Sequence, residues 1–304
     1  MKQPAPRARK RAGTPSTGRG ASKQVIISRH AGFCFGVKRA LELVEQAKGE
    51  QPGPWRTLGP LIHNPQVVAK LRQQGVKVAA SLDRTRRGSL IIPSHGTSPD
   101  ILRQAQERGL QVVDATCPFV SKSQQVARLL SEQGYRIVMV GDRGHPEVVG
   151  VLSYTEPDPI VIEGPQEARS LRRMKRVGLL VQTTQTVERL REVAAILVGK
   201  CEELRVFNTI CGATQQRQAA ALELARWAQV MIVVGGHNSA NTARLREVCA
   251  SAGVEAHQLE TPQEVDPAWL ADKQRIGVTA GASTPQWLIE GVVERLQQIA
   301  ARQT

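Results

Sequence analysis

The sequence predicts an α/β protein of three related units, each with a parallel sheet, arranged around a pseudo-threefold axis. Short β-branched runs alternate with amphipathic helical stretches. The same ordered set of loop motifs also occurs three times, and each motif stands where a strand passes into a helix. Ligands of parallel sheets gather at the carboxyl ends of strands, so three inward-facing units would share one central site.

The predicted elements follow this alternation along the chain. The first is a strand at Gln24–Ser28, and an apolar stripe indicates a helix over Phe35–Lys48. Further along the chain, apolar runs predict strands buried on both faces of a parallel sheet. They are Arg136–Val140, Gly178–Val181, Val230–Val234 and Arg275–Thr279. The expected divisions are a tail of residues 1–24, units over 25–109 and 110–202, and a third unit over 203–304 that ends in a C-terminal helix.

Composition limits the class of protein. The net charge is +14, and aromatic residues make up only 3% of the chain. No apolar run approaches the ~20 residues of a membrane span, and no signal-peptide pattern opens the chain. Residues 1–24 carry basic side chains and no acid, which predicts a disordered basic tail. A solvated extension, a nucleic-acid-binding arm and a transit-like peptide are its three interpretations. The rest of the excess charge suits an anionic substrate or an acidic protein partner.

The cysteine pattern indicates metal binding rather than disulfides. The five cysteines are odd in number and widely spaced, which favours a reducing cytoplasm. Three occupy equivalent strand-to-helix loops, where a helix N-terminus lowers a thiol pKa: Cys34, Cys117 and Cys211. Three thiolates suit either zinc or a cubane iron–sulfur cluster with one iron left open to substrate. Cys201 and Cys249 have no ligand context and are expected to be structural.

The remaining loops predict a pocket for a compact polyanion. Histidines stand in register at His63, His95 and His145, and the third unit offers Ser239 and Asn241 instead. With the free N–H groups of helix N-termini, these donors suit phosphate or diphosphate. No nucleotide-binding glycine pattern is present. Glu147, next to His145, is either a general acid whose pKa is raised by burial or a cap of its own helix.

Together these motifs resemble the 4-hydroxy-3-methylbut-2-enyl diphosphate reductase family, which acts in isoprenoid biosynthesis. The resemblance covers about residues 25–300 and rests on GFCFGV (32–37), SHG (94–96), DATCP (114–118), GHPEV (144–148), QTT (182–184) and TAGAS (279–283). It implies a three-domain fold with a central [4Fe–4S] cluster on the three cysteines. It also implies reductive dehydroxylation of an allylic diphosphate to isopentenyl and dimethylallyl diphosphate, with electrons from a ferredoxin or flavodoxin.

The resemblance also implies roles for individual residues. Glu147 would be the proton donor, and Thr183 would lie near the substrate hydroxyl. Diphosphate would be bound by His63, His95, His145, Ser239, Asn241, Ser283 and the main-chain N–H of Ala240, which stands where some members have serine.

Two other functions compete with this interpretation. One is a zinc or mononuclear-iron lyase that uses the same thiolates on a phosphorylated metabolite. The other is a nucleic-acid-binding protein that uses the basic tail, against which the scarcity of stacking aromatics argues.

Overall fold

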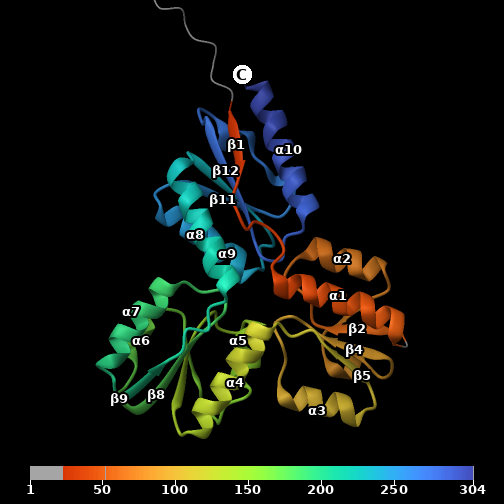
Figure 1. The fold of residues 1–304 in the computed structure, drawn as a ribbon, viewed down its shortest axis with the longest axis vertical. Helices are drawn as coiled ribbons and strands as arrows, with labels where there is room; N and C mark the ends of the chain where they lie inside the picture. The colour runs from red at the N-terminus through yellow and green to blue at the C-terminus, as the bar shows by residue number, and fades with distance from the viewer. Residues whose placement is uncertain (1–22, 52, 304) are drawn as a thin grey trace, which may run out of the picture.

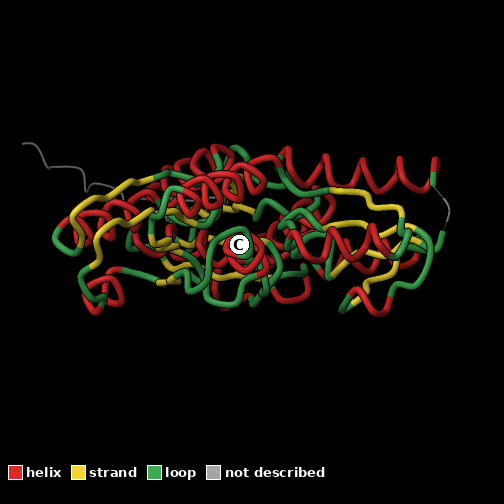
Figure 2. Tube along the Cα trace, turned by 90° about the horizontal axis from the view of Figure 1, so that it is seen from below, coloured by secondary structure: helices red, strands yellow, loops and turns green. Residues whose placement is uncertain are grey.

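The computed structural model describes residues 23–51 and 53–303, so nearly all of the predicted tail lies outside the described residues. Within this part of the chain, three four-stranded sheets are present, and all of their strand pairs are parallel. Each sheet with its helices makes one lobe, and the three lobes meet at the centre of a flat molecule (Figure 1, Figure 2). The prediction of three α/β units is confirmed.

The first sheet has the strand order β3-β2-β4-β5. Ile91 of its central strand faces α1 and α2, whereas Leu90 and Ile92 face α3, the period-two alternation of a strand buried on both faces. The elements of this lobe are α1 (Phe35–Glu50), β2 (Trp55–Leu58), α2 (Pro65–Gln73), β3 (Lys77–Ala79), a 3-10 turn (Leu82–Arg84), β4 (Ser89–Ile92), α3 (Pro99–Glu107) and β5 (Gln111–Asp114).

The second sheet has the order β7-β6-β8-β9 and is covered in the same way. Met139 of β6 packs against α4 and α5, and its neighbour Val138 packs on the opposite face against α7. The elements are α4 (Pro118–Glu132), β6 (Arg136–Val140), α5 (Pro146–Leu152), β7 (Ile160–Ile162), α6 (Pro165–Ser170), β8 (Met174–Val181), α7 (Val187–Val198) and β9 (Cys201–Val206).

The third sheet has the order β1-β12-β10-β11 and contains both the first and the last strand of the described chain. Ile232 faces α10, and the flanking Met231 and Val233 face α8 and α9. The elements are β1 (Gln24–Ile27), α8 (Gly212–Trp227), β10 (Val230–Val234), α9 (Ala240–Ser251), β11 (Glu255–Leu259), two 3-10 turns (Pro262–Glu264, Pro267–Leu270), β12 (Arg275–Ala280) and α10 (Gln286–Arg302). No helix in the described ranges is long and apolar enough to cross a bilayer.

The sheets group three strands differently from the expected units. β1 pairs with β12 of the third unit, β5 completes the first sheet and β9 completes the second (Figure 1). The helix that follows each of these strands packs on the next sheet, so each strand–helix pair is a crossing between lobes. A repeat fixes the order of elements but not which neighbour a strand pairs with, so it leaves the sheet membership of these strands open. The exact unit limits stay a prediction.

Candidate functional site

Nine strand-to-helix loops of the described chain end at one central cavity. The cavity has a volume of about 120 Å³ and is lined from all three lobes. It contains every residue that the sequence analysis proposed for the site: Cys34, His63, His95, Cys117, His145, Glu147, Thr183, Cys211, Ser239, Ala240, Asn241 and Ser283. The predicted convergence of the loops is therefore observed, whereas the roles of the residues stay predictions.

The three cysteines have equivalent positions at the crossings between lobes. Cys34, Cys117 and Cys211 are the N-caps of α1, α4 and α8, and none of their side chains makes a capping hydrogen bond. Their backbone N–H groups donate to a carbonyl of the neighbouring third loop, Ala282, Ser94 and Thr183, over 3.0–3.1 Å. This shared geometry leaves all three thiols free to bind a ligand in the cavity.

The pKa values of two of these thiols are raised, whereas the sequence predicted that they would be lowered. Burial raises the pKa of Cys117 to about 11 and also raises that of Cys211, although backbone N–H groups of the following helix turn act in the opposite direction. The prediction that helix N-termini would lower these pKa values was wrong because desolvation of the thiolate outweighs the helix amides. A positively charged ligand or side chain is needed to hold these sulfurs as thiolates.

The thiols suit a ligand larger than one ion. No set of three or more His, Cys, Asp and Glu side chains in the described residues is placed to hold a single metal ion. A Cβ built on Gly36 would lie 2.6 Å from the Sγ of Cys117 and 3.9 Å from that of Cys34, so only glycine leaves room there. Thiols that share a cavity without converging on one ion fit a cubane cluster, which spreads its ligands over separate irons.

The other two cysteines lie outside the cavity. Cys249 of α9 is fully buried in an apolar cluster, and Cys201 begins β9 with its thiol against the carbonyl of Leu197. Neither lines the cavity, in keeping with the structural role expected for both.

Three histidine rings lie side by side in the cavity wall. The ring centroid of His63 lies 5.4 Å from that of His95 and 4.9 Å from that of His145. Burial lowers the pKa of all three, to about 3 for His95 and about 4 for His145, so the rings of the free protein are neutral at pH 7. An anion placed against them would raise these pKa values again.

Hydrogen bonds assign the tautomers of two of these rings. His145 Nδ1 accepts from the backbone N–H of Glu147 over 3.1 Å, so its proton is on Nε2. His95 Nδ1 lies 3.2 Å from the carbonyl oxygen of Gly96, which can only accept, so its proton is on Nδ1. The Nε2 atoms of His95 and His63 are buried and have no hydrogen-bond partner. Such orphaned polar atoms indicate a polar ligand in the cavity.

The third lobe adds further donors at the N-terminus of α9. Ser239 caps this helix, and the N–H of Ala240, in its first turn, has no acceptor within the helix. Asn241 accepts from the N–H of Ala282 over 2.9 Å, while its Nδ2 donor is buried without a partner. Ser283 donates from Oγ to the main-chain carbonyl of His63 over 3.0 Å and so joins the third lobe to the first.

Among the described residues, Glu147 is the one carboxyl group that lines the cavity. It is 4% exposed, and its two oxygens accept from the N–H and the Oγ of Thr183, each over 2.7 Å. These bonds reach another loop, so the carboxyl does not cap its own helix. Burial raises the pKa of Glu147, and the nearby Asp142 adds to the rise. The raised pKa, as expected from the sequence, favours a carboxyl group that keeps its proton toward neutral pH.

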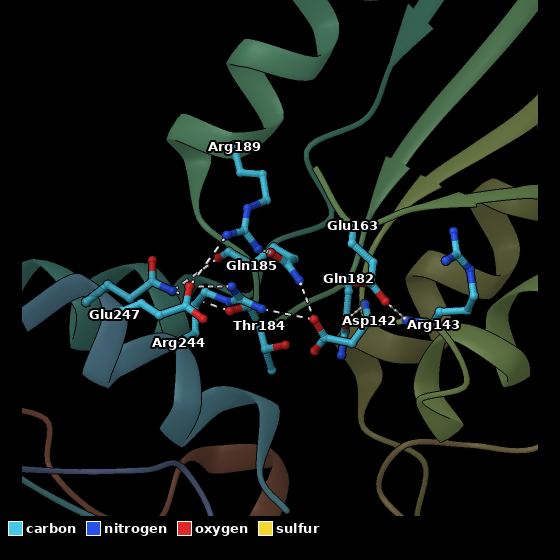
Figure 3. Close-up of polar contacts among 10 residues, drawn as sticks. Asp142, Arg143, Glu163, Gln182, Thr184, Gln185, Arg189, Arg244 and Glu247 are labelled. Atoms are coloured by element: carbon cyan, nitrogen blue, oxygen red, sulfur yellow. Dashed lines mark hydrogen bonds and ion pairs between the residues drawn. The ribbon is translucent and has the colours of Figure 1, made fainter. Parts of the chain in front are cut away.

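An ion-pair network joins the second and third lobes beside this loop (Figure 3). Arg244 of α9, only 6% exposed, donates from Nη2 to Asp142 Oδ1 over 2.9 Å and also pairs with Glu247. Asp142 lies in the β6–α5 loop, which leads into the first turn of α5 and Glu147. Gln185 donates to the same Oδ1 over 3.2 Å. The network therefore holds α9 against the loop of the buried carboxyl.

Arg244→Met should destabilise the protein, because it removes the buried cation from Asp142. Breaking a fully buried pair costs ~3–5 kcal/mol, and the 35% exposure of the Asp142 side chain reduces the expected loss to about 1–3 kcal/mol. Chemical unfolding measures this loss. The control is Arg143→Met, which breaks an exposed pair with Glu167 and should cost at most ~1 kcal/mol. Equal losses in the two variants would contradict a special role for the network.

Some residues that line the cavity were not predicted from the sequence. Ser94, Thr184, Thr214 and Ala282 also line it, and the Oγ of Thr184 is buried without a partner. Ser94, Thr184 and Ala282 stand inside motifs already quoted, so a wider selection around each motif would have included them. His237, which occupies an equivalent loop, lies outside the cavity and pairs with Glu264 over 3.1 Å.

Comparison with known proteins places this geometry in a family. A family model described as LytB protein matches residues 25–297. The chain belongs to the LytB protein family. It is 48% identical over 281 residues to a 4-hydroxy-3-methylbut-2-enyl diphosphate reductase of Geobacter metallireducens, which covers 92% of this chain and 99% of that protein.

Two solved structures share the LytB fold. One, of (E)-4-hydroxy-3-methyl-but-2-enyl diphosphate reductase, the terminal enzyme of the non-mevalonate pathway, is 41% identical with a TM-score of 0.64 and covers 91% of this chain and 99% of that one. The other, of the E-1-hydroxy-2-methyl-but-2-enyl-4-diphosphate reductase from Plasmodium falciparum, is 28% identical with a TM-score of 0.84 and covers 90% and 87%. The resemblance seen in the motifs is thereby confirmed.

Proposed function

We propose that this LytB protein is an oxidoreductase that removes the hydroxyl group of 4-hydroxy-3-methylbut-2-enyl diphosphate and yields isopentenyl and dimethylallyl diphosphate for isoprenoid biosynthesis. One observation carries the proposal: a single cavity contains three uncapped thiols, a row of buried histidines and a buried carboxyl–hydroxyl pair. The names of relatives that match over nearly their whole length agree with it.

Cys34, Cys117 and Cys211 would hold a [4Fe–4S] cluster. Their free thiols and the space left by Gly36 fit such a group. When bound, the cluster would supply electrons and an iron without a protein ligand. No nucleotide-binding motif is present in the sequence, so the electrons would come from a separate protein of the ferredoxin or flavodoxin class. A cytoplasmic location belongs to the same proposal.

The side chains of the cavity would divide the substrate between them. The donors to the diphosphate would be the Nε2–H of His145, the Nδ2 of Asn241, the hydroxyls of Ser239 and Ser283 and the N–H of Ala240. The Nε2 atoms of His63 and His95 would join them once the bound anion has raised the pKa of these rings and protonated them. At the other end, Glu147 would hold a proton against the substrate hydroxyl, and Thr183 would orient it. The hydroxyl would then leave as water instead of hydroxide.

The deciding experiment uses anaerobically purified protein, an artificial reductant and the synthetic substrate. Formation of the two five-carbon diphosphates, together with measured iron and sulfide, would support the proposal. Colourless protein that binds zinc in place of iron would favour the lyase alternative. The nucleic-acid alternative depends on the basic tail, and binding that is steeply salt-dependent and lost on deletion of residues 1–22 would favour it.

Replacement of the cavity histidines should weaken substrate binding. We expect His63→Ala or His95→Ala to lower the affinity about 10- to 100-fold, because a hydrogen bond to a charged group is worth ~1.5–3 kcal/mol. Calorimetry with the substrate or inorganic diphosphate measures this loss on cluster-loaded protein. His237→Ala is the matched control, since that ring lies outside the cavity and should leave the affinity unchanged. Wild-type affinity in both cavity variants would exclude diphosphate binding by these rings.

A further inference from the structure

Arg217 is a buried cation beside the thiols. It lies on α8 and is only 3% exposed. Its Nη2 donates to the carbonyl oxygen of Gly32 over 2.6 Å, in the loop that carries Cys34. Its Nη1 lies 3.4 Å from the carbonyl of Ala213, and its Nε has no hydrogen-bond partner. The guanidinium thus spans from the helix that starts at Cys211 to the loop of Cys34.

This arginine pairs with no carboxylate in the described ranges. Arg244 of the adjacent helix is similarly buried but, unlike Arg217, pairs with two carboxylates, those of Asp142 and Glu247. A buried charge without a counter-charge is costly, so such residues are retained where an opposite charge is placed nearby. Burial lowers the pKa of Arg217, and the groups that act in the opposite direction are the thiols of Cys34 and Cys211.

We infer that Arg217 is the counter-ion of the metal cluster on the three cysteines and that its fixed positive charge raises the reduction potential of that cluster. The inference rests on the proposed function, because it requires the cluster. One-electron reduction adds a negative charge to a group that the thiolates already make anionic. In a buried site, a nearby cation stabilises the reduced form more than the oxidised form. Arg217 would act through the cluster and would not touch the substrate.

The midpoint potential of the cluster tests the inference. The holoproteins compared are the parent, Arg217→Gln, Arg217→Lys and Arg244→Met, all without substrate in an anaerobic redox titration followed by electron paramagnetic resonance. Arg217→Gln removes the charge and keeps a polar hydrogen-bond donor, although with a shorter reach than the Nη2 that contacts the Gly32 carbonyl. Its reduction equilibrium constant should fall at least tenfold, a shift of about 59 mV to lower potential for one electron. Arg217→Lys should lie close to the parent, and so should Arg244→Met.

Each result of these measurements either supports or overturns the counter-ion role of Arg217. A parent protein that assembles no cluster would refute the proposed function itself. A loaded Arg217→Gln protein with the parent's potential would overturn the inference and leave the function intact. If Arg217→Gln takes up no cluster but Arg217→Lys does, the requirement for charge is supported. If neither takes up a cluster, the shape of the guanidinium matters and the inference is wrong.

Discussion

Cys117→Ser should abolish stable cluster binding and, with it, reductase turnover down to the background of the assay. Cys117 is the N-cap of α4 at the crossing from the first lobe to the second. Its thiol makes no capping hydrogen bond, so the substitution removes no bond of that kind from the helix. A serine hydroxyl at this position is much less acidic than a thiol and is a poor ligand for the soft iron sites of such a cluster. Cys34→Ser and Cys211→Ser should behave in the same way.

The measurements are iron and sulfide content and absorption near 400 nm of anaerobically prepared protein, followed by turnover. Cys201→Ser and Cys249→Ser are the matched controls, because both thiols lie outside the cavity. Either control can lose stability by burying a hydroxyl, but it should keep its cluster and turnover once folded. A Cys117→Ser protein with the parent's iron and sulfide content would refute the cluster assignment.

The positions of the three cysteines give the proposed cluster a second role, in the stability of the fold. Each cysteine lies where the chain leaves one sheet and starts the helix that packs on the next. A cluster held by all three would therefore link every pair of lobes at the centre of the molecule. Its binding free energy would add to the stability of the arrangement, as for any ligand that binds only the folded state.

The repeat made much of the site predictable. Parallel strands buried on both faces appear in sequence as continuous apolar runs, and the strand-to-helix loops after them carried the motifs. Because these loops lie at one edge of each sheet, their convergence followed from the order of motifs alone. The sheet membership of β1, β5 and β9 did not follow, since pairing is a tertiary choice that the local pattern leaves open.

Features that depend on burial were beyond the sequence. The helix N-terminus beside Cys117 was visible, but the desolvation that raises the thiol pKa was not. Arg217 looks like an ordinary exposed helix arginine in the stretch QQRQAA, and only the structure places it beside two thiols and away from any carboxylate of the described chain. The direction of the Glu147 pKa shift is the exception and was predicted: burial raises this pKa and outweighs the two hydrogen bonds from Thr183, which lower it.

Glu147→Gln should reduce turnover by about 10²–10⁴-fold, the usual cost of losing a general acid, and the upper part of the range is expected because hydroxide is a poor leaving group. The amide has nearly the same shape as the acid. Its oxygen can still accept from the N–H of Thr183, and its NH₂ can donate to the Thr183 hydroxyl, so both 2.7 Å contacts have a replacement. Fold and cluster content should therefore be unchanged.

Glu167→Gln is the control that separates the loss of the Glu147 proton from the general effect of replacing a carboxyl group by an amide. Glu167 is also in the first turn of its helix, α6, but it pairs with Arg143 at the surface, so its amide variant should turn over like the parent. Thr183→Val should have a smaller effect than Glu147→Gln, since a hydroxyl can orient or relay a proton but is too weakly acidic to replace a carboxyl group. Turnover with an artificial reductant, iron content and melting temperature are measured on each variant. A folded, cluster-loaded Glu147→Gln protein whose turnover lies within about fivefold of the parent would exclude the general-acid role, because that loss is far below the range for such a group.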